Sequence, residues 1–156
     1  MAKRIVNRIG DIYSVNVGSG KHRFFQYITK DSAAFNSQVI RVFKSKYSLD
    51  FVFDSDQVIH DDVDFYAHTI LVGNQEKYWT KVGSCKDVGP TDNIVFKADY
   101  GQRDNLSWYI WTINHDIKFV GRISPEEMKH IYWGAIYPFS HIVEKIKNGK
   151  YPGEYI

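Results

Sequence analysis

The sequence predicts a single β-rich α+β domain over residues 1–156, in which a strongly bent antiparallel sheet or partly open barrel carries one or two C-terminal helices. Three observations predict this class. The length of 156 residues suits one ordinary domain with its own core. Short alternating segments rich in β-branched and aromatic residues occupy the first four fifths of the chain. Helical spacing of apolar residues is confined to the last fifth.

The first strands are the most regular. Residues 11–17 alternate apolar and polar side chains, which is typical of a half-buried strand, and Gly18-Ser19-Gly20 then predicts a tight turn. Residues 22–29 form the returning strand, and residues 37–47 form a third. Six further strands are expected at residues 50–53, 65–72, 78–82, 94–98, 107–113 and 117–122.

The C-terminal fifth carries signals for two helices. Ser124 can cap a helix in which Pro125 takes the first position and Glu127 reaches back to the cap. A second helix is predicted at Phe139–Asn148, because its apolar residues recur at i, i+3, i+4 and i+7 and Gly149 follows directly. We expect its apolar stripe to lie against the sheet.

Charge and cysteine content exclude several classes of protein. The 20 Lys and Arg residues nearly balance the 18 Asp and Glu residues. The resulting net charge of +2 is too small to indicate nucleic-acid binding. Cys85 is the one cysteine and cannot form an intramolecular disulfide. The N-terminal apolar run is too short for a signal peptide, and no apolar stretch approaches the ~18 residues of a membrane span. We expect a cytoplasmic protein.

Two short segments suggest chemistry but favour structural roles. Gly18-Ser19-Gly20-Lys21 lacks the full spacing of a phosphate-binding loop, has His22 where a magnesium ligand belongs, and precedes a strand instead of a helix. Cys85 lies beside Lys86, which could lower the pKa of the thiol, yet nothing around it matches a nucleophile motif. We interpret the first segment as a hairpin turn and Cys85 as an inert residue.

The densest set of possible metal ligands is His60, Asp61, Asp62, Asp64 and His68. Two imidazoles and a carboxylate could hold zinc or iron, but the spacing matches no standard site. The alternative is an acidic loop leading into a strand with an exposed polar face, and that face could also contact a basic partner. We expect no bound metal and no other cofactor.

Large side chains point to both faces of the strand predicted at residues 107–113. One interpretation is a central strand covered by the C-terminal helix on one side and by a curled sheet on the other. The functional interpretation leaves part of Tyr109, Trp111 and Trp133 in an exposed patch, because Trp and Tyr dominate binding hot spots.

Basic residues in the N-terminal third suggest a nucleic-acid surface as an alternative. They are interleaved with the aromatic residues Phe24, Phe25 and Tyr27, on which bases could stack. The basic residues are Arg4, Arg8, Lys21, Arg23, Arg41, Lys44 and Lys46. Their alkyl stems can equally cover apolar sheet edges and deter edge pairing.

The segment Arg8-Ile9-Gly10-Asp11-Ile12-Tyr13-Ser14-Val15, followed after a glycine turn by Phe24-Phe25-Gln26-Tyr27-Ile28, resembles the start of bacterial immunity protein family 26. The resemblance covers about a fifth of the chain. It implies a β-rich body and a cytoplasmic protein that binds and neutralises the cognate toxin domain of a polymorphic toxin system. No catalytic residues carry over, because immunity of this kind is achieved by binding.

We therefore expect a toxin-neutralising binding protein, not an enzyme, that contacts its partner through Tyr109, Trp111 and Trp133 and through an acidic face. That face comprises Asp61, Asp62 and Asp64. Two other classes remain open. One is a nucleic-acid-binding β-barrel module, and the other is a metal-dependent enzyme that uses the His60–His68 region.

Overall fold

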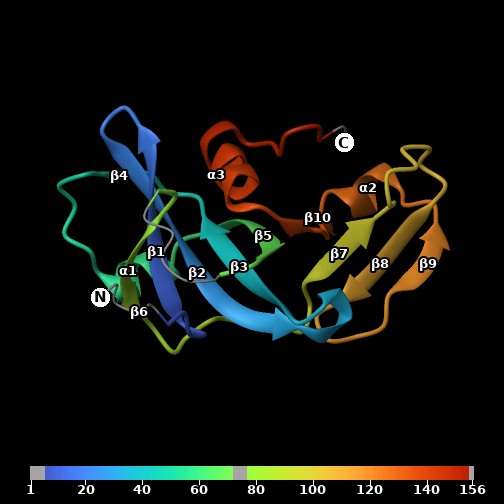
Figure 1. The fold of residues 1–156 in the computed structure, drawn as a ribbon, viewed down its shortest axis with the longest axis horizontal. Helices are drawn as coiled ribbons and strands as arrows, with labels where there is room; N and C mark the ends of the chain where they lie inside the picture. Colours follow the sequence, from blue (N-terminus) through green and yellow to red (C-terminus); the bar gives the residue numbers. More distant parts are fainter. Residues whose placement is uncertain (1–5, 72–76, 155–156) are drawn as a thin grey trace.

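The computed structural model describes residues 6–71 and 77–154. Two β-sheets lie next to each other along the molecule, and the C-terminal helix covers the first of them (Figure 1). This arrangement confirms the predicted fold class, a β-rich α+β protein whose bent sheets do not close and carry a C-terminal helix.

Among the described residues, the first sheet has seven strands in the order β11-β5-β3-β2-β1-β6, with β4 paired to the start of β2. Its strands are β1 (Asp11–Gly18), β2 (Lys21–Asp31), β3 (Ser37–Phe43), β4 (Tyr47–Ser48), β5 (Val63–Thr69), β6 (Thr80–Ser84) and β11 (Ile136–Tyr137). The second sheet has the order β10-β7-β8-β9. Its strands are β7 (Val95–Ala98), β8 (Trp108–Thr112), β9 (Lys118–Gly121) and β10 (Tyr132–Trp133).

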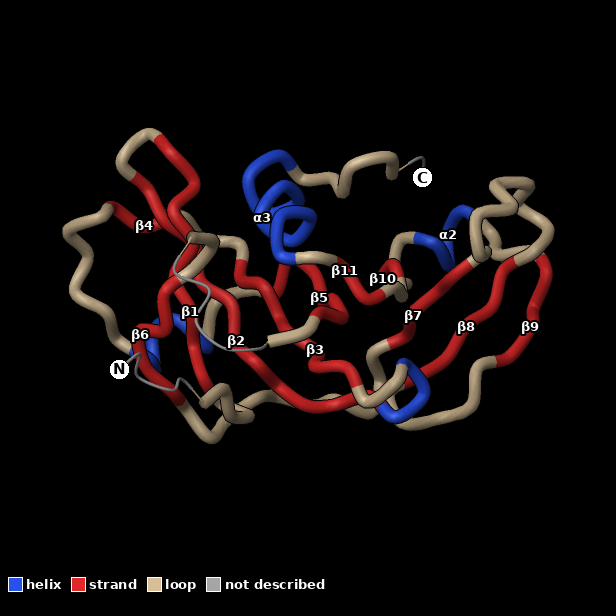
Figure 2. Tube along the Cα trace, viewed as in Figure 1, coloured by secondary structure: helices blue, strands red, loops and turns tan. Residues whose placement is uncertain are grey.

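Within residues 6–71 and 77–154, four helical segments connect or cover the sheets, and Figure 2 draws the helices in blue. They are η1 (Ser32–Ala34), α1 (Ser55–Ile59), α2 (Pro125–Met128) and α3 (Phe139–Asn148). α2 begins as predicted, because the Ser124 side chain accepts a hydrogen bond from the Glu127 amide at 3.2 Å and Pro125 takes the first turn. α3 has the predicted bounds and ends at Gly149, which has a left-handed φ of 85°.

The first hairpin follows directly from its turn residues. Ser19 and Gly20 have φ values of 54° and 70°, and positive φ at both central positions is the geometry that matches the twist of a two-residue hairpin. β1 and β2 then pair antiparallel from Ile12 with Gln26 to Gly18 with Lys21. The Gly18–Lys21 segment is therefore a hairpin turn, as predicted.

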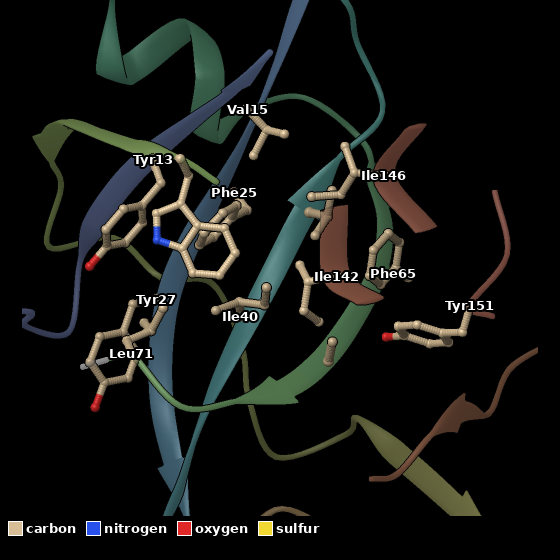
Figure 3. Packing of buried hydrophobic residues seen from close by; sticks show 13 residues of the cluster. Tyr13, Val15, Phe25, Tyr27, Ile40, Phe65, Leu71, Ile142, Ile146 and Tyr151 are labelled. Atoms are coloured by element: carbon tan, nitrogen blue, oxygen red, sulfur yellow. The ribbon is translucent and has the colours of Figure 1, made fainter. Parts of the chain in front are cut away.

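The largest core cluster lies between the first sheet and α3 (Figure 3). Phe25 and Tyr13 stack at 4.8 Å between ring centroids, and Ile142 and Ile146 bring the apolar stripe of α3 onto the same layer. Burial of this stripe against the sheet stabilises a helix of ten residues that would be marginal alone. The predicted orientation of α3 is confirmed.

Two separate clusters cover different parts of the opposite face of the first sheet. Near α1, Phe24 and Phe43 pack against Val58 and Ile59 of that helix. Farther along β2 and β3, the sheet packs against the second sheet in a cluster that includes Ile28, Val39, Ile94, Phe96 and Trp111. The second sheet is therefore attached through the far end of β2 and β3.

Three strands predicted from apolar content differ from the structure. Residues 50–53 form a loop, because Phe51 and Phe53 fill the space beside Phe24 with their rings while their backbone pairs with no strand. The strand predicted at 37–47 ends at Phe43, and β4 pairs separately with β2. The strand predicted at 65–72 begins at Val63 and ends at Thr69, and residue 72 lies outside the described part of the chain.

Both sheets are mixed rather than purely antiparallel. The two-residue strands β10 and β11 pair in parallel with β7 and β5, respectively. Because they are separated by two residues, they link the second sheet to the first. Strands this short carry no readable alternation, so the sequence did not predict them.

None of the helices in the described part of the chain has the length and apolar character needed to cross a membrane.

Candidate functional site: an apolar groove beside the junction of the sheets

A groove of about 400 Å³ lies where η1, the turn after β7 and the link between β10 and β11 meet. We call it the apolar groove and define it by Phe35, Tyr100, Trp111, Ile117, Trp133 and Tyr137. Ligand-binding clefts in proteins are concave, mostly apolar and of this size. The groove is therefore the leading candidate for a binding site in the described structure.

Trp111 forms the floor of the groove and is largely buried, with 5% of its surface exposed. A Cβ atom placed on Gly134 would lie 2.2 Å from the Trp111 ring and 3.0 Å from Phe96 Cβ. The Gly134 amide also donates a 2.7 Å hydrogen bond to the Lys97 carbonyl, which holds the link close to β7. Glycine is thus the residue that lets the link pass directly over the indole.

We expect Gly134→Ala to destabilise the protein by about 1–3 kcal/mol, because the new methyl group would overlap the largely buried Trp111 ring and crowd Phe96 Cβ, so the link or the ring must shift. Urea unfolding followed by tryptophan fluorescence measures the loss. Ala135→Gly is the neighbouring control, which removes a methyl group instead of adding one. A Gly134→Ala protein as stable as the wild type would contradict the packing described for the groove floor.

Asp31, at the end of β2, joins the elements that build the groove. Its Oδ2 accepts hydrogen bonds from His68 Nε2 at 2.8 Å and Trp111 Nε1 at 2.9 Å. Its Oδ1 accepts from the amides of Ala33 at 3.0 Å and Asn114 at 2.9 Å. One carboxylate therefore fixes η1, the groove floor and the turn after β8.

The Asp31 and His68 side chains are both inaccessible to solvent. Burial alone raises the pKa of the Asp31 carboxyl, but the hydrogen bonds from His68, the Asn114 amide and Trp111 outweigh it, so the pKa lies below its ordinary value. Asp31 is therefore held as a carboxylate. Because it has four donors and lies within the core, its role is to organise the groove.

The rim of the groove carries two exposed aromatic rings on unusual backbone. Phe35 is 93% exposed with a φ of 55°, and Tyr100 is 64% exposed with a φ of 51°. Left-handed backbone costs a residue with a Cβ roughly 1–2 kcal/mol relative to ordinary conformations. Bulky residues rarely occupy it. Two aromatic side chains are therefore held outward at an energetic cost, a feature that clusters at functional sites.

The apolar surface continues from the rim to the edge of the second sheet. Tyr109 lies 5.1 Å from Tyr100 and 5.1 Å from Phe119, measured between ring centroids. Phe119 and Val120 belong to β9, where they are 62% and 41% exposed. Among the described strands, β9 pairs with β8 alone, so its outer edge is available for pairing.

The three aromatic residues predicted to contact a partner come together in this region. Tyr109 is half-buried on β8 between the rim and β9, Trp111 is the floor, and half-buried Trp133 lines the groove wall. Trp111 offers little surface of its own because its indole is committed to Asp31 and the core. β8 is the central strand that the sequence predicted, but α3 packs on the first sheet and does not cover it.

The predicted acidic face is divided among separate environments. Asp61 accepts hydrogen bonds from the Ser45 amide at 2.7 Å and hydroxyl at 2.9 Å, which ties down the turn before β5. Asp62 is exposed, and Asp64 forms a 2.8 Å ion pair with Arg23. Two of these three aspartates therefore have structural partners.

The predicted metal ligands do not converge. His60 follows α1 and its Nδ1 lies 2.6 Å from the Asp56 carbonyl, whereas His68 is bound to Asp31 in the core. Across residues 6–71 and 77–154, no group of three or more His, Cys, Asp or Glu side chains could hold a metal ion. Half-buried Cys85 packs at the edge of the cluster near α1, with its backbone bound to Gly10.

The surface proposed for nucleic-acid binding is largely internal. Phe24, Phe25 and Tyr27 are all buried and serve the core. Arg23 is buried and donates to the Phe43 and Ile146 carbonyls at 2.7 and 2.8 Å, and buried Arg41 donates to Gln26 at 2.9 Å. Base stacking on these rings is therefore not available in the folded protein.

The fold and groove together define an α+β protein with two bent sheets and an aromatic-rimmed apolar groove at their junction. No protein-family model, no curated protein and no solved structure matches this chain. The resemblance to immunity protein family 26 therefore stays a prediction.

Proposed function

We propose that this protein is an immunity protein that binds a cognate bacterial toxin domain in the cytoplasm and neutralises it through protein–protein contact. The apolar groove and the adjoining edge of β9 form the contact surface. The observation that carries the proposal is the outward placement of Phe35 and Tyr100 on left-handed backbone beside the groove. The partial resemblance to immunity protein family 26 is the reason for proposing a toxin domain as the partner.

Exposed aromatic rings next to a concave apolar surface are the usual composition of a binding hot spot. In water the Phe35 and Tyr100 rings contribute little to the stability of the fold, because they bury little area in the folded chain. A partner that inserts an apolar side chain into the groove would bury both rings along with its own surface. Burial of apolar surface is the dominant favourable contribution in most protein–protein association.

The edge of β9 offers a second mode of contact to the same partner. An extended segment can add to a free sheet edge through backbone hydrogen bonds, while side-chain contacts provide specificity. Phe119 and Val120 lie on opposite faces of β9 and would flank such a segment on its two sides, and Tyr109 connects Phe119 to the rim. A partner that uses both features would contact one continuous surface.

An apolar contact also fits the charge of the chain. An acidic immunity protein is needed where a basic nuclease cleft is blocked by electrostatic complementarity. This chain has a net charge of +2, and the groove is lined mainly by apolar and aromatic residues. We therefore propose that inhibition relies on shape and apolar burial rather than on an acidic plug.

A growth assay tests the proposal. The toxin domain encoded next to this gene is expressed in bacteria with and without this protein, and growth is followed. The wild-type protein is expected to restore growth and to co-purify with the toxin domain. Equal killing in the presence and absence of soluble wild-type protein would overturn the proposal.

A further inference from the structure

A second cavity, of about 220 Å³, lies on the other side of Trp133, between β5, β7, the segment after α2 and the C-terminal segment after α3. We call it the lysine cavity and define it by Asp64, Lys97, Tyr132, Trp133, Lys145 and Glu154. Its walls include five aromatic side chains, and its charged side chains are those of Asp64, Lys97, Lys145 and Glu154. Their pairing decides what the cavity can bind.

Three of these four charges are neutralised within the protein. Asp64 pairs with Arg23 at 2.8 Å, and Lys145 pairs with Glu154 at 3.2 Å. Glu154 also accepts a 2.8 Å hydrogen bond from the Tyr151 amide, and the Lys145 ammonium lies 4.5 Å from the Tyr151 ring centroid. Neither carboxylate is therefore left to accompany Lys97.

Among the described residues that line the cavity, Lys97 is the remaining charge, and it is 4% exposed. Its ammonium donates to the Ile131 carbonyl at 3.1 Å and lies 4.9 Å from the centroid of Trp133 and 5.9 Å from that of Trp108. No carboxylate of the described residues lies within ion-pair distance of it. An ammonium has three donors, so two remain after the bond to Ile131.

The surroundings of Lys97 disfavour its charge. Burial lowers the pKa of Lys97, an effect that Glu154 opposes and Lys145 reinforces. A buried charge without an ionic partner is costly, and an anion beside it removes most of that cost. The net charge of the lysine cavity with Arg23 included is one positive unit, because two of its three cations are paired with carboxylates.

We propose that the lysine cavity binds a small organic monoanion, a carboxylate carried on a flat or aromatic body. The two carboxylate oxygens of the ligand accept hydrogen bonds from the two remaining N–H groups of Lys97. The aromatic side chains of Tyr132 and Trp133 enclose the flat part of the ligand. The volume is below that of cavities for drug-sized ligands, which limits the ligand to a small molecule. This site goes beyond the proposed function and requires no toxin.

The probe for this site is benzoate, with benzamide as a neutral molecule of the same shape. Binding is followed by tryptophan fluorescence, because Trp133 lies on the cavity wall, and by thermal unfolding of the unaltered protein. Benzoate is expected to quench fluorescence saturably and to raise the melting temperature, whereas benzamide at the same concentration has no effect. Equal responses to the two probes would overturn the proposal, and this comparison needs no variant.

Substitution of the lysine locates the site. Lys97→Met keeps the length of the side chain and removes the buried charge, so the protein is expected to fold and to bind benzoate at least tenfold more weakly. Lys129→Met is the matched control, because Lys129 pairs with Glu126 on the exposed surface of α2, and its benzoate affinity should equal that of the wild type. A folded Lys97→Met protein with wild-type affinity would also overturn the proposal. Inorganic phosphate serves as a third probe, and tighter binding of phosphate than of benzoate would contradict a carboxylate site.

Discussion

Replacing Asp31 with Ala is expected to remove about 3–5 kcal/mol of folding free energy, a larger loss than that expected for Gly134→Ala. The change deprives the side chains of His68 and Trp111 and two backbone amides of their shared acceptor, at a position inaccessible to solvent. Buried donors left without a partner incur their full desolvation cost, and four donors lose their acceptor in this variant. Urea unfolding measures the loss.

Asp31→Asn removes the negative charge of the side chain while keeping its size and shape. The amide can still accept at one oxygen but presents an NH₂ group where the second oxygen was, so it cannot serve all four donors. We expect an intermediate loss of stability, smaller than that of Asp31→Ala. A loss below about 1 kcal/mol for the alanine variant would show that Asp31 does not hold the sheets and the groove together.

The lowered pKa of Asp31 also predicts a pH dependence of stability. Because the folded-state pKa lies below the ordinary value of 3.8, the unfolded chain binds the proton more tightly. The stabilising contribution is therefore complete above pH values near 3.8 and is lost as the pH falls from there through the folded-state pKa. Asp31→Asn should lack this part of the pH dependence when unfolding free energies are measured across that range.

Replacing Phe35 with Gly is expected to weaken toxin binding about 30-fold or more while leaving the fold intact, because a central hot-spot residue contributes about 2 kcal/mol or more. Phe35 is 93% exposed and has a φ of 55°, so glycine loses almost no packing and relieves the strain of left-handed backbone. The free energy of unfolding should change by less than about 1 kcal/mol. Calorimetric titration with the toxin domain measures the affinity.

Val52→Gly is the matched control for Phe35→Gly. Val52 is 84% exposed in the loop between β4 and α1, outside the apolar groove. Its replacement should leave the affinity for the toxin domain unchanged. If both variants bind like the wild type, the rim of the groove is not the contact surface.

The sequence predicted the regular parts of this fold well, because those parts carry local signals. The alternation in β1, the turn at Ser19 and Gly20, and the spacing and terminal Gly149 of α3 all depend on residues close together in the chain. The strand predicted at residues 50–53 is wrong because Phe51 and Phe53 are apolar for packing and not for pairing. Apolar content does not distinguish these uses.

The candidate site was predictable only in part. Tyr109, Trp111 and Trp133 were selected for their size, and all three lie in or next to the groove. Phe35 and Tyr100 were missed because exposure and left-handed backbone depend on the tertiary structure. Neighbouring Asn36 and Gly101, residue types that tolerate positive φ, were the available signals. The role of Asp31 was not predictable, since three of its four partners are 37, 80 and 83 residues away.

Hydrogen exchange of the protein alone and in complex with the toxin domain tests whether the apolar groove and the β9 edge are the contact surface. We expect slower exchange on binding in residues 33–36, 98–101, 117–121 and 133–137, which form the groove and the β9 edge. Residues 60–64, which carry the separate acidic side chains, should exchange at the same rate in both states. Protection confined to residues 60–64 would contradict this assignment of the contact surface. Absence of protection in the groove and the β9 edge, with the toxin domain bound at a saturating concentration, would also contradict it.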